Sequence, residues 1–367
     1  MSAAVKVEGI AEGAALAVSR DVRFRPRVPP NFFGIALGLV GLAEAWRAAV
    51  SIRGTSLVIP DAANILAATV WLGLGLVYLA QGPRVVVADL RDPVLAPFVP
   101  LAAIAGMLLG AALGAYALGA ARVFVSLFLA ITVLLGGLLM GQWIVGDLDE
   151  AKLHPGYFLP TVAGGLVGAF CAAQVDLRAV AEASFGLGII SWLFLGPLLF
   201  NRLFFRPALP TALAPTLAIQ LAPPAVAGVA LFALNGPRVS PFACALGGYA
   251  VLMALVQLRL LSVYVKLPFS PGFWTFTFSY AVSATDALEW ISAKRPTGSP
   301  VYAACVLTAV TLLIGVISVR TVVLLFRGRL FPPPPLAADF CVDVGQGPGG
   351  EMSSHQSETL SHTAVHV

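Results

Sequence analysis

Few residues of this chain could do chemistry, and the most telling ones lie near the ends of long apolar runs. Glu44 and Arg47 stand three residues apart, so they can pair on one face of a helix. Asp286 and Glu289 share a second run and precede the basic positions 294–295. Ionisable groups inside such runs are costly and usually functional, so Glu44, Asp286 and Glu289 are candidates for titration. Charge pairs near a membrane interface are the interpretation favoured over a proton relay.

No enzyme signature accompanies these acids. The sequence has no HExxH, Walker A, GxSxG or paired DxxxD motif. The stretch 147–154 combines acids with His154, and a solvated loop is favoured there over a metal site because charged runs in loops are the default. We therefore expect no catalytic residue, no metal and no cofactor.

The composition indicates a membrane protein. Of 367 residues, 59% are hydrophobic and 11% are charged, whereas a soluble domain carries about 25% charged residues. Repeated apolar runs of about 20 residues match the length of a helical span, and they lack the alternation of an outer-membrane barrel. The net charge of +4 comes from basic residues in short loops, which orient spans in the lipid bilayer rather than bind nucleic acid.

The runs predict an all-α polytopic membrane protein with ten transmembrane helices. Fifteen Lys and Arg residues fall on the side of the termini and seven on the other, which predicts that both termini are cytoplasmic in a cell (inner) membrane. We expect a cytoplasmic N-terminal segment at 1–28, a transmembrane domain at 29–327 and a disordered cytoplasmic tail at 328–367. The predicted spans are 31–50, 59–80, 97–117, 120–145, 156–175, 180–200, 213–234, 241–264, 273–291 and 300–325.

A repeat runs through these spans. The odd-numbered spans open near prolines that stand 56 to 67 residues apart, an interval that suits a helical hairpin. Five hairpins can close into a pseudo-symmetric ring around a central pore. The odd spans are the better inner helices because they hold more glycine and interrupting proline. The prolines are Pro30, Pro97, Pro155, Pro215 and Pro271.

The ninth span is rich in aromatic residues, and Phe278 lies deeper in it than Trp274. A ring in a narrow apolar neck can block ions by excluding water, so Phe278 is a candidate pore gate, with helix packing as the alternative. No Lys or Arg lies at mid-span to hold an anion, which favours a weakly binding, channel-like path. Candidate pore-lining or kink positions are Phe33, Gly34, Pro160, Pro223 and Phe276.

Three motifs resemble the tellurite-resistance/dicarboxylate transporter family, which includes TehA-type proteins and slow anion channels. They are the stretches 31–39 (NFFGIALGL), 154–162 (HPGYFLPTV) and 274–278 (WTFTF). The resemblance implies five pseudo-symmetric hairpins, odd helices lining a pore, a homotrimer, and an occluding phenylalanine at Phe278. The chain has Ala36 and Ser279 where the family often has proline, which alters the expected shape of the pore.

We therefore expect a channel or transporter for small anions. Chloride, nitrate, sulfite, tellurite and C4-dicarboxylates are the candidate cargoes, and the sequence does not choose among them. One alternative is a proton-coupled C4-dicarboxylate carrier in which Glu44, Asp286 or Glu289 titrates during turnover. An alternative from another class is a membrane-embedded enzyme or a sensor that acts through its tail.

Overall fold

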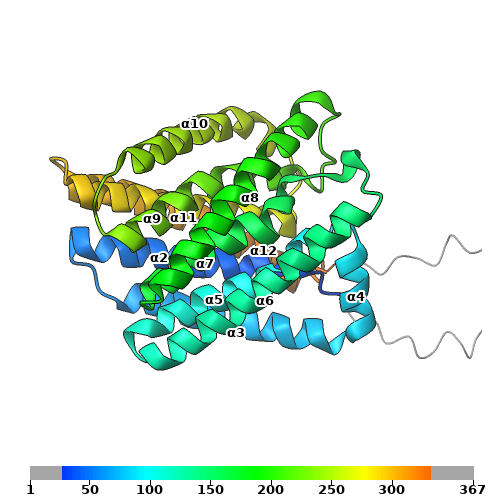
Figure 1. Ribbon diagram of the computed structural model, residues 1–367, viewed down its shortest axis with the longest axis horizontal. Coiled ribbons are helices and arrows are strands. Elements are labelled where there is room, and N and C mark those ends of the chain that lie inside the picture. Colours follow the sequence, from blue (N-terminus) through cyan, green and yellow to red (C-terminus); the bar gives the residue numbers. More distant parts are fainter. Residues whose placement is uncertain (1–26, 332–367) are drawn as a thin grey trace, which may run out of the picture. The chain divides into compact units, whose positions relative to one another are not determined.

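The computed structural model describes residues 27–331, and all regular structure within them is helical (Figure 1). Predictions for residues 1–26 and 332–367, including most of the N-terminal segment and of the tail, lie outside the described residues. Nine helices of the described part are long and apolar enough to cross a membrane, so the protein is a polytopic membrane protein. They are Pro30–Arg53, Val58–Ala80, Ala96–Ala115, Leu118–Val145, Pro155–Gln174, Arg178–Phe205, Ala214–Asn235, Pro241–Tyr264 and Ser299–Phe326.

A further helix, α11 (Trp274–Lys294), corresponds to the predicted ninth span. It has 21 residues, which is long enough to cross a bilayer, but it is less apolar than the other nine and does not meet the same criterion. Its polar side chains include Thr277, Ser279 and Asp286. The count of ten spans therefore stays a prediction.

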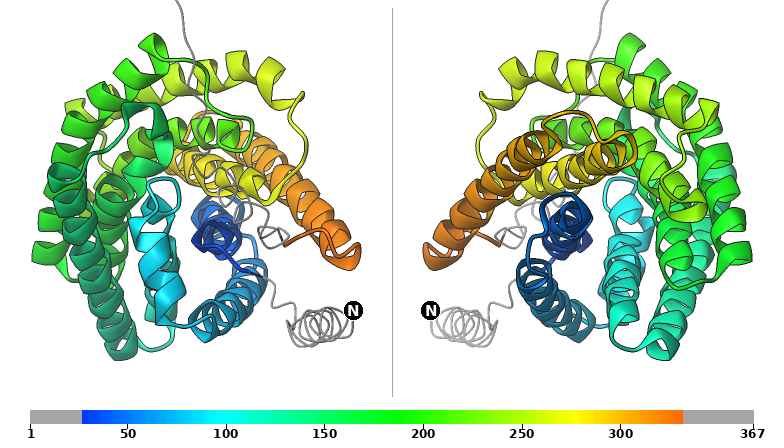
Figure 2. Two further views of the ribbon diagram at one scale, coloured as in Figure 1. Left: turned by 90° about the vertical axis from the view of Figure 1, so that its right-hand side faces the viewer. Right: turned by 90° about the vertical axis from the view of Figure 1, so that its left-hand side faces the viewer.

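The helices form two layers within residues 27–331 (Figure 2). In the inner helices other than α11, more than half of the most apolar stretch is buried, whereas in the outer helices less than a third is. The inner layer consists of α2 (Phe33–Arg53), α5 (Leu101–Ala112), α7 (Gly164–Gln174), α9 (Ala222–Asn235) and α11. The outer layer consists of α3 (Val58–Ala80), α6 (Leu118–Val145), α8 (Arg178–Phe205), α10 (Pro241–Tyr264) and α12 (Ser299–Phe326).

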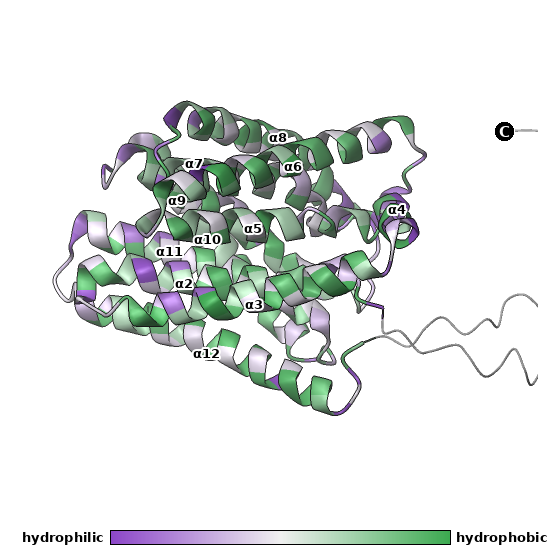
Figure 3. Cartoon of the chain, turned by 90° about the horizontal axis from the view of Figure 1, so that it is seen from below, coloured by the Kyte–Doolittle hydropathy of each residue, from purple (hydrophilic) through white to green (hydrophobic). Residues whose placement is uncertain are grey.

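The inner helices close into a ring. In ring order, α2 contacts α5, then come α7, α9 and α11, and α11 packs along α2 again. Each outer helix packs against the inner helix that precedes it in the chain. Hydrophobic residues cover most of the helices and hydrophilic ones gather near their ends and on α4 (Pro83–Arg91), as expected for a surface that faces lipid (Figure 3).

Each inner helix begins with a short segment that contains a proline at its first or second position. Proline fits there because the first turn leaves its N–H groups without helical partners. These segments are η1 (Pro30–Phe32), η2 (Ala96–Phe98), η5 (Pro155–Phe158), η7 (Ala214–Leu221) and η8 (Pro271–Phe273). After η5, a π-helical turn, η6 (Leu159–Ala163), precedes the start of α7.

The chain segments at the two limits of the described part pack together. Leu330, which we expected to lie in a disordered tail, is buried against Val28 and Phe32. The ring of Phe331 stacks on Phe32 with centroids 5.7 Å apart. Apolar residues beyond α12 therefore cover the start of the first inner helix.

Candidate functional site

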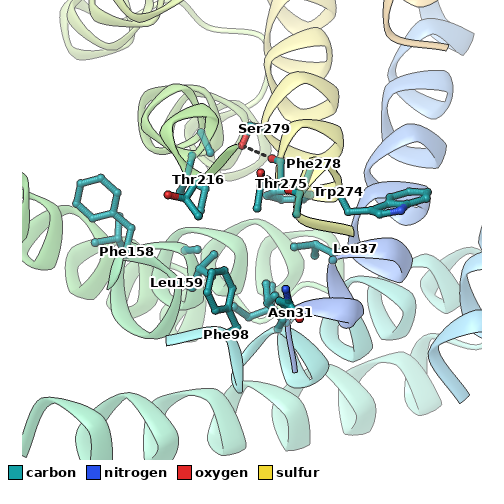
Figure 4. Close-up of a pocket in the computed structure, with 18 of the residues that line it drawn as sticks. Asn31, Leu37, Phe98, Phe158, Leu159, Thr216, Trp274, Thr275, Phe278 and Ser279 are labelled. Carbon is teal, nitrogen blue, oxygen red and sulfur yellow. Dashed lines mark hydrogen bonds between the residues drawn. The ribbon is translucent and has the colours of Figure 1, made fainter. Parts of the chain in front are cut away.

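Two cavities follow one another along the axis of the inner ring. The larger, here called the proximal cavity, has a volume of about 230 Å³ and lies where the inner helices begin. Every inner helix or its leading segment contributes to the wall (Figure 4). Representative lining residues, one from each, are Asn31, Phe98, Leu159, Thr216 and Thr275.

The smaller, here called the distal cavity, has a volume of about 20 Å³, which is room for about one water molecule. It lies further along the same five helices, toward their C-terminal ends. All five contribute to its wall, so it belongs to the same axis. Representative lining residues, one from each helix, are Glu44, Leu108, Phe170, Val229 and Val282.

Phe278 lies at the boundary between the two cavities. It lines both of them, as does Val226 from the opposite part of the ring, on α9. On α2 the boundary falls between Leu37, which lines the proximal cavity, and Gly41, which lines the distal one. An aromatic ring of α11 thus lies where the two axial cavities approach each other.

A glycine face on α2 positions this ring. Gly34, Gly38 and Gly41 share one side of the helix and face α11. A Cβ atom at Gly38 would stand 1.9 Å from Thr277 Oγ1, and one at Gly41 would stand 3.1 Å from Phe278 Cδ2. Because the missing side chains let α11 approach the α2 backbone this closely, the ring of Phe278 reaches the axis.

The hydroxyl groups that line the proximal cavity are already engaged in hydrogen bonds to the backbone. The hydroxyls of Thr216, Thr275 and Ser279 donate to backbone carbonyl groups, at 2.6 to 3.1 Å. Asn31 also lines the cavity, and its Oδ1 atom has no hydrogen-bond partner among the described residues. No Lys or Arg side chain of the described part lines either axial cavity, as the sequence predicted.

The backbone supplies a different electrostatic feature. The segments that open the five inner helices all contribute residues to the proximal cavity. The N-terminal end of a helix carries roughly half a positive charge, because its first N–H groups have no helical partners. Five such ends therefore surround one apolar cavity.

Comparison with known proteins identifies the family. The family model described as voltage-dependent anion channel matches residues 27–322, which covers the whole ring and both cavities. The chain belongs to the voltage-dependent anion channel family. The family comprises channels and transporters of anions, which agrees with the resemblance read from the three sequence motifs.

Three individual proteins are similar to this chain. A tellurite resistance protein TehA homolog from Haemophilus influenzae is 28% identical over 308 residues, which cover 83% of this chain and 93% of that protein. An uncharacterized transporter from Methanocaldococcus jannaschii is 28% identical over 246 residues, 60% of this chain and 71% of its own length. The guard cell S-type anion channel of Arabidopsis thaliana is 26% identical over 159 residues, 42% of this chain and 28% of that protein.

Two of the five pore-lining or kink candidates line the proximal cavity, namely Gly34 and Pro223. Phe33 instead packs against Tyr78 of α3, with ring centroids 5.8 Å apart. Phe276 is 6% exposed and packs edge-on against Tyr264 of α10, with centroids 4.7 Å apart. Neither phenylalanine faces the axis, because each points from its inner helix toward the outer layer.

Pro160 does not line either cavity. It lies in the π-helical turn before α7, and its carbonyl oxygen would stand 3.1 Å from a Cβ atom at Gly136 of α6. The irregular turn accommodates a proline within the buried start of the span. Pro160 therefore belongs to an irregular turn of the chain and not to the wall of either axial cavity.

The three candidate titrating residues lie in different surroundings. Glu44 is 7% exposed, lines the distal cavity and forms the predicted ion pair with Arg47, at 3.8 Å. Asp286 is 6% exposed, and its Oδ1 atom has no hydrogen-bond partner within residues 27–331. Glu289 is half-buried and lines neither axial cavity. Glu44 thus has a basic partner on its own helix, whereas Asp286 forms no ion pair within residues 27–331.

Asp286 lies on another side of α11, away from the axial cavities. It lines a wide groove of about 970 Å³ between α10, α11 and α12, which is open on one side. A Cβ atom at Gly228 would stand 2.2 Å from Asp286 Oδ1, so the carboxyl group rests directly on the α9 backbone. The groove exists because α10 packs mainly against α9 and makes little contact with α11 or α12.

The surroundings of His154 differ from those that we predicted from the sequence. We expected a solvated loop, but the side chain is fully buried and stacks on Phe98, with ring centroids 5.4 Å apart. Its Nδ1 atom accepts a hydrogen bond from the Gly156 N–H at 3.1 Å, so the proton lies on Nε2, which donates to the Val94 carbonyl at 3.2 Å. Burial is the main cause that lowers the pKa of His154 to about 4. Among the described residues no cluster could hold a metal ion.

Proposed function

We propose that the protein passes small anions along the axis enclosed by α2, α5, α7, α9 and α11, with Phe278 as the gate. The observation that carries this proposal is that Phe278 lines both axial cavities at the level of the neck. A ring in an apolar neck excludes water, and an ion cannot cross a neck that it must enter without water. Movement of the ring would let the two cavities join.

The five helix N-termini around the proximal cavity support anions as the cargo. The walls of this cavity carry no charged side chain, so the backbone dipoles set the sign of its potential. The resulting potential is positive and attracts anions without binding them tightly. Weak binding is what conduction requires, since an ion must leave a site as readily as it enters.

The same walls favour small inorganic anions within the proposed class. A C4-dicarboxylate is usually held by Arg side chains that donate two hydrogen bonds to each carboxylate, and no Arg lines the axial cavities within residues 27–331. Chloride and nitrate need no such partner. Tellurite stays in the proposed class because a relative is named for tellurite resistance, and sulfite stays because it is likewise a small inorganic oxyanion.

We further propose that α11 is the tenth span, that the spans form five pseudo-symmetric hairpins, and that the protein is a homotrimer in the inner membrane with both termini cytoplasmic. The 21-residue length of α11 and its place in the inner ring support the span. The packing of every outer helix on the preceding inner helix supports the hairpins. Since one chain encloses the axis, each protomer of a trimer would hold its own pathway.

Anion-replacement recording tests the proposed function. The purified protein is reconstituted into liposomes or planar bilayers, and chloride is exchanged in turn for nitrate, sulfite, tellurite and malate. We expect the reversal potential to follow the anion gradient, with chloride and nitrate passing more readily than malate. Absence of anion flux from well-folded protein, with and without Phe278, would overturn the proposal.

A proton-coupled C4-dicarboxylate carrier is the second candidate function. The buried carboxyl groups of Glu44 and Asp286 favour it, because each has an oxygen without a hydrogen-bond partner among the described residues. A carrier would accumulate malate against its own gradient when an inward proton gradient is imposed. A channel would only dissipate the malate gradient under the same conditions.

A further inference from the structure

Glu44 is the only charged side chain of the described residues that lines either axial cavity, and its charge is negative. It belongs to the wall of the distal cavity, three residues after Gly41, against which the ring of Phe278 rests. An anion that passes Phe278 therefore meets a carboxyl group in a space that holds about one water molecule.

The hydrogen bonds of Glu44 leave part of this carboxyl group free. Oε2 accepts one hydrogen bond, from Gln174 Nε2 at 3.3 Å. Oε1 accepts none within residues 27–331, and it lies 3.8 Å from Arg47 Nε, which is too far for a hydrogen bond. Arg47 Nε is itself buried without a hydrogen-bond partner. The ion pair is therefore a loose one.

Other charges around Glu44 do not cancel its own. Arg47 is shared with Asp61 of α3, whose Oδ1 lies 3.3 Å from Arg47 Nη2. On α11 the ionisable group close enough to interact with Glu44 is Glu289, which is also an acid. On α7 Cys171 is the titratable neighbour, while α5 and α9 have no titratable residue. One guanidinium group thus faces several carboxyl groups.

We infer that Glu44 is the electrostatic selectivity element of the distal pathway, which repels permeating anions when it is ionised and admits them when it is neutral. This inference rests on the proposed function, since it concerns an anion on the same axis. Two like charges that share a narrow apolar space repel strongly, because little water is present to screen them. Protonation of Glu44 removes that repulsion without any movement of the helices.

Acid is then an activator of the pathway. When the pH falls, a larger fraction of Glu44 is neutral, and anion flux rises even if Phe278 behaves as before. The ring and the carboxyl group act in series, so removal of Phe278 alone leaves a pathway that still responds to pH. Removal of the Glu44 charge alone leaves a pathway that is still limited by the ring.

The experiment measures anion flux into liposomes at about pH 8 and about pH 5.5. The two parent proteins are the wild type and the Phe278→Ala variant, and each parent is compared with the same protein carrying Glu44→Gln. Glutamine keeps the size of the side chain and can still accept from Gln174. We expect acid to raise flux at least about tenfold in each parent, and Glu44→Gln to give at both pH values the flux that its own parent reaches in acid. Glu44→Asp, which keeps the charge, should retain the acid response.

Glu182→Gln is the matched control. Glu182 lies on α8 in an exposed pair with Arg178, at 2.8 Å, and lines neither axial cavity, so the acid response should persist in this variant. Flux is normalised to the amount of folded protein recovered by size-exclusion chromatography. An acid response in Glu44→Gln equal to that of its parent, or none in wild type, would overturn the inference alone. Absence of flux from every variant at both pH values would overturn the proposed function and, with it, the inference.

Discussion

Gly41 of α2 lies directly against the ring of Phe278 on α11. A Cβ atom at Gly41 would stand 3.1 Å from Phe278 Cδ2, which is tighter than most van der Waals contacts, and 3.7 Å from Cε2, which is an ordinary one. The ring of Phe278 thus borders the space that a side chain would fill on α2. This relationship makes Gly41 a partner of the proposed gate although it carries no side chain.

Gly41→Ala should raise anion flux severalfold, because the added methyl group crowds the ring in its closed position. The same change should have no effect on flux in a Phe278→Ala background, since no ring is left to crowd. The measurement is liposome flux for the two single variants and the double variant. Equal effects of Gly41→Ala in both backgrounds would show that it acts elsewhere, for example on Ala281, whose Cβ would also lie 3.1 Å away.

Phe278→Ala should raise anion flux by tenfold or more, because removal of the ring lets water enter the neck. Phe276→Ala is the control on the same helix. Phe276 packs against Tyr264 rather than the axis, so its loss should cost about 3 kcal/mol of stability and leave flux per folded molecule unchanged. Single-channel recording together with thermal unfolding in detergent separates the two effects. Unchanged flux in well-folded Phe278→Ala would remove the gate assignment.

Gly165→Ala should destabilise the packing of α7 on α8. A Cβ atom at Gly165 would stand 2.5 Å from the backbone nitrogen of Gly188, and backbone cannot move aside as a flexible side chain can. We expect a loss of about 1–3 kcal/mol, measured as a lower unfolding temperature. Gly186→Ala is the matched control, because no atom lies within 4 Å of a Cβ at this position of α8. Equal melting temperatures for both variants would contradict the helix contact.

Acid should destabilise the protein through His154. Its pKa is about 4 in the folded chain and ordinarily 6.5, so the unfolded chain binds a proton between these values and the folded chain does not. The contribution is complete above pH 6.5 and is lost as the pH falls toward 4, up to about 3 kcal/mol.

The measurement is the unfolding temperature in detergent at several pH values. The His154→Phe variant keeps the stacking on Phe98 and loses the titrating group. It should lose less stability on acidification than wild type, although it is less stable at neutral pH. A pH dependence identical to that of wild type would assign the acid sensitivity to other groups.

The proposed tenth span can be tested by labelling. Lys266 and Thr297 are exposed and flank α11 and its leading segment, so cysteines introduced at these positions should react with an impermeant reagent from opposite sides of the membrane. The native cysteines are first replaced by alanine. Labelling of both positions from one side would mean that α11 does not cross, and a periplasmic C-terminus would mean that the span count is wrong by one.

The boundaries of the helices followed closely from the sequence. The predicted spans 59–80, 120–145 and 241–264 agree within two residues with the observed Val58–Ala80, Leu118–Val145 and Pro241–Tyr264. Hydropathy indicates such boundaries because every span needs about 20 predominantly apolar residues to cross the hydrocarbon core. The helix α4 was missed, since it is nine residues long and lies in a loop, where Asp89 pairs with Arg27 and accepts from Tyr78.

The site followed from the sequence only in part. The sequence indicated Phe278 through its depth in an aromatic span, but not that it lies between two cavities, which depends on four other helices. Phe33 and Phe276 were predicted as pore-lining candidates together with Phe278, because the sequence alone does not show which neighbouring helix each aromatic side chain faces. The burial of His154 depends on Phe98 and Val94, which lie more than fifty residues away in the chain. Contacts of this kind have no local sequence signature.

The positive potential that we propose for the proximal cavity has a consequence for which substitutions can alter the preference among anions. The attraction for anions that we propose there comes from main-chain N–H groups at five helix ends, since no lysine or arginine of residues 27–331 lines the cavity. A scan that replaces basic residues one at a time would therefore not detect this attraction, because the replacement of a side chain leaves the main-chain N–H groups in place. Tuning between anions is left to the uncharged side chains that set the width and wetting of the passage, and these can vary without reversing the sign of the ion that passes.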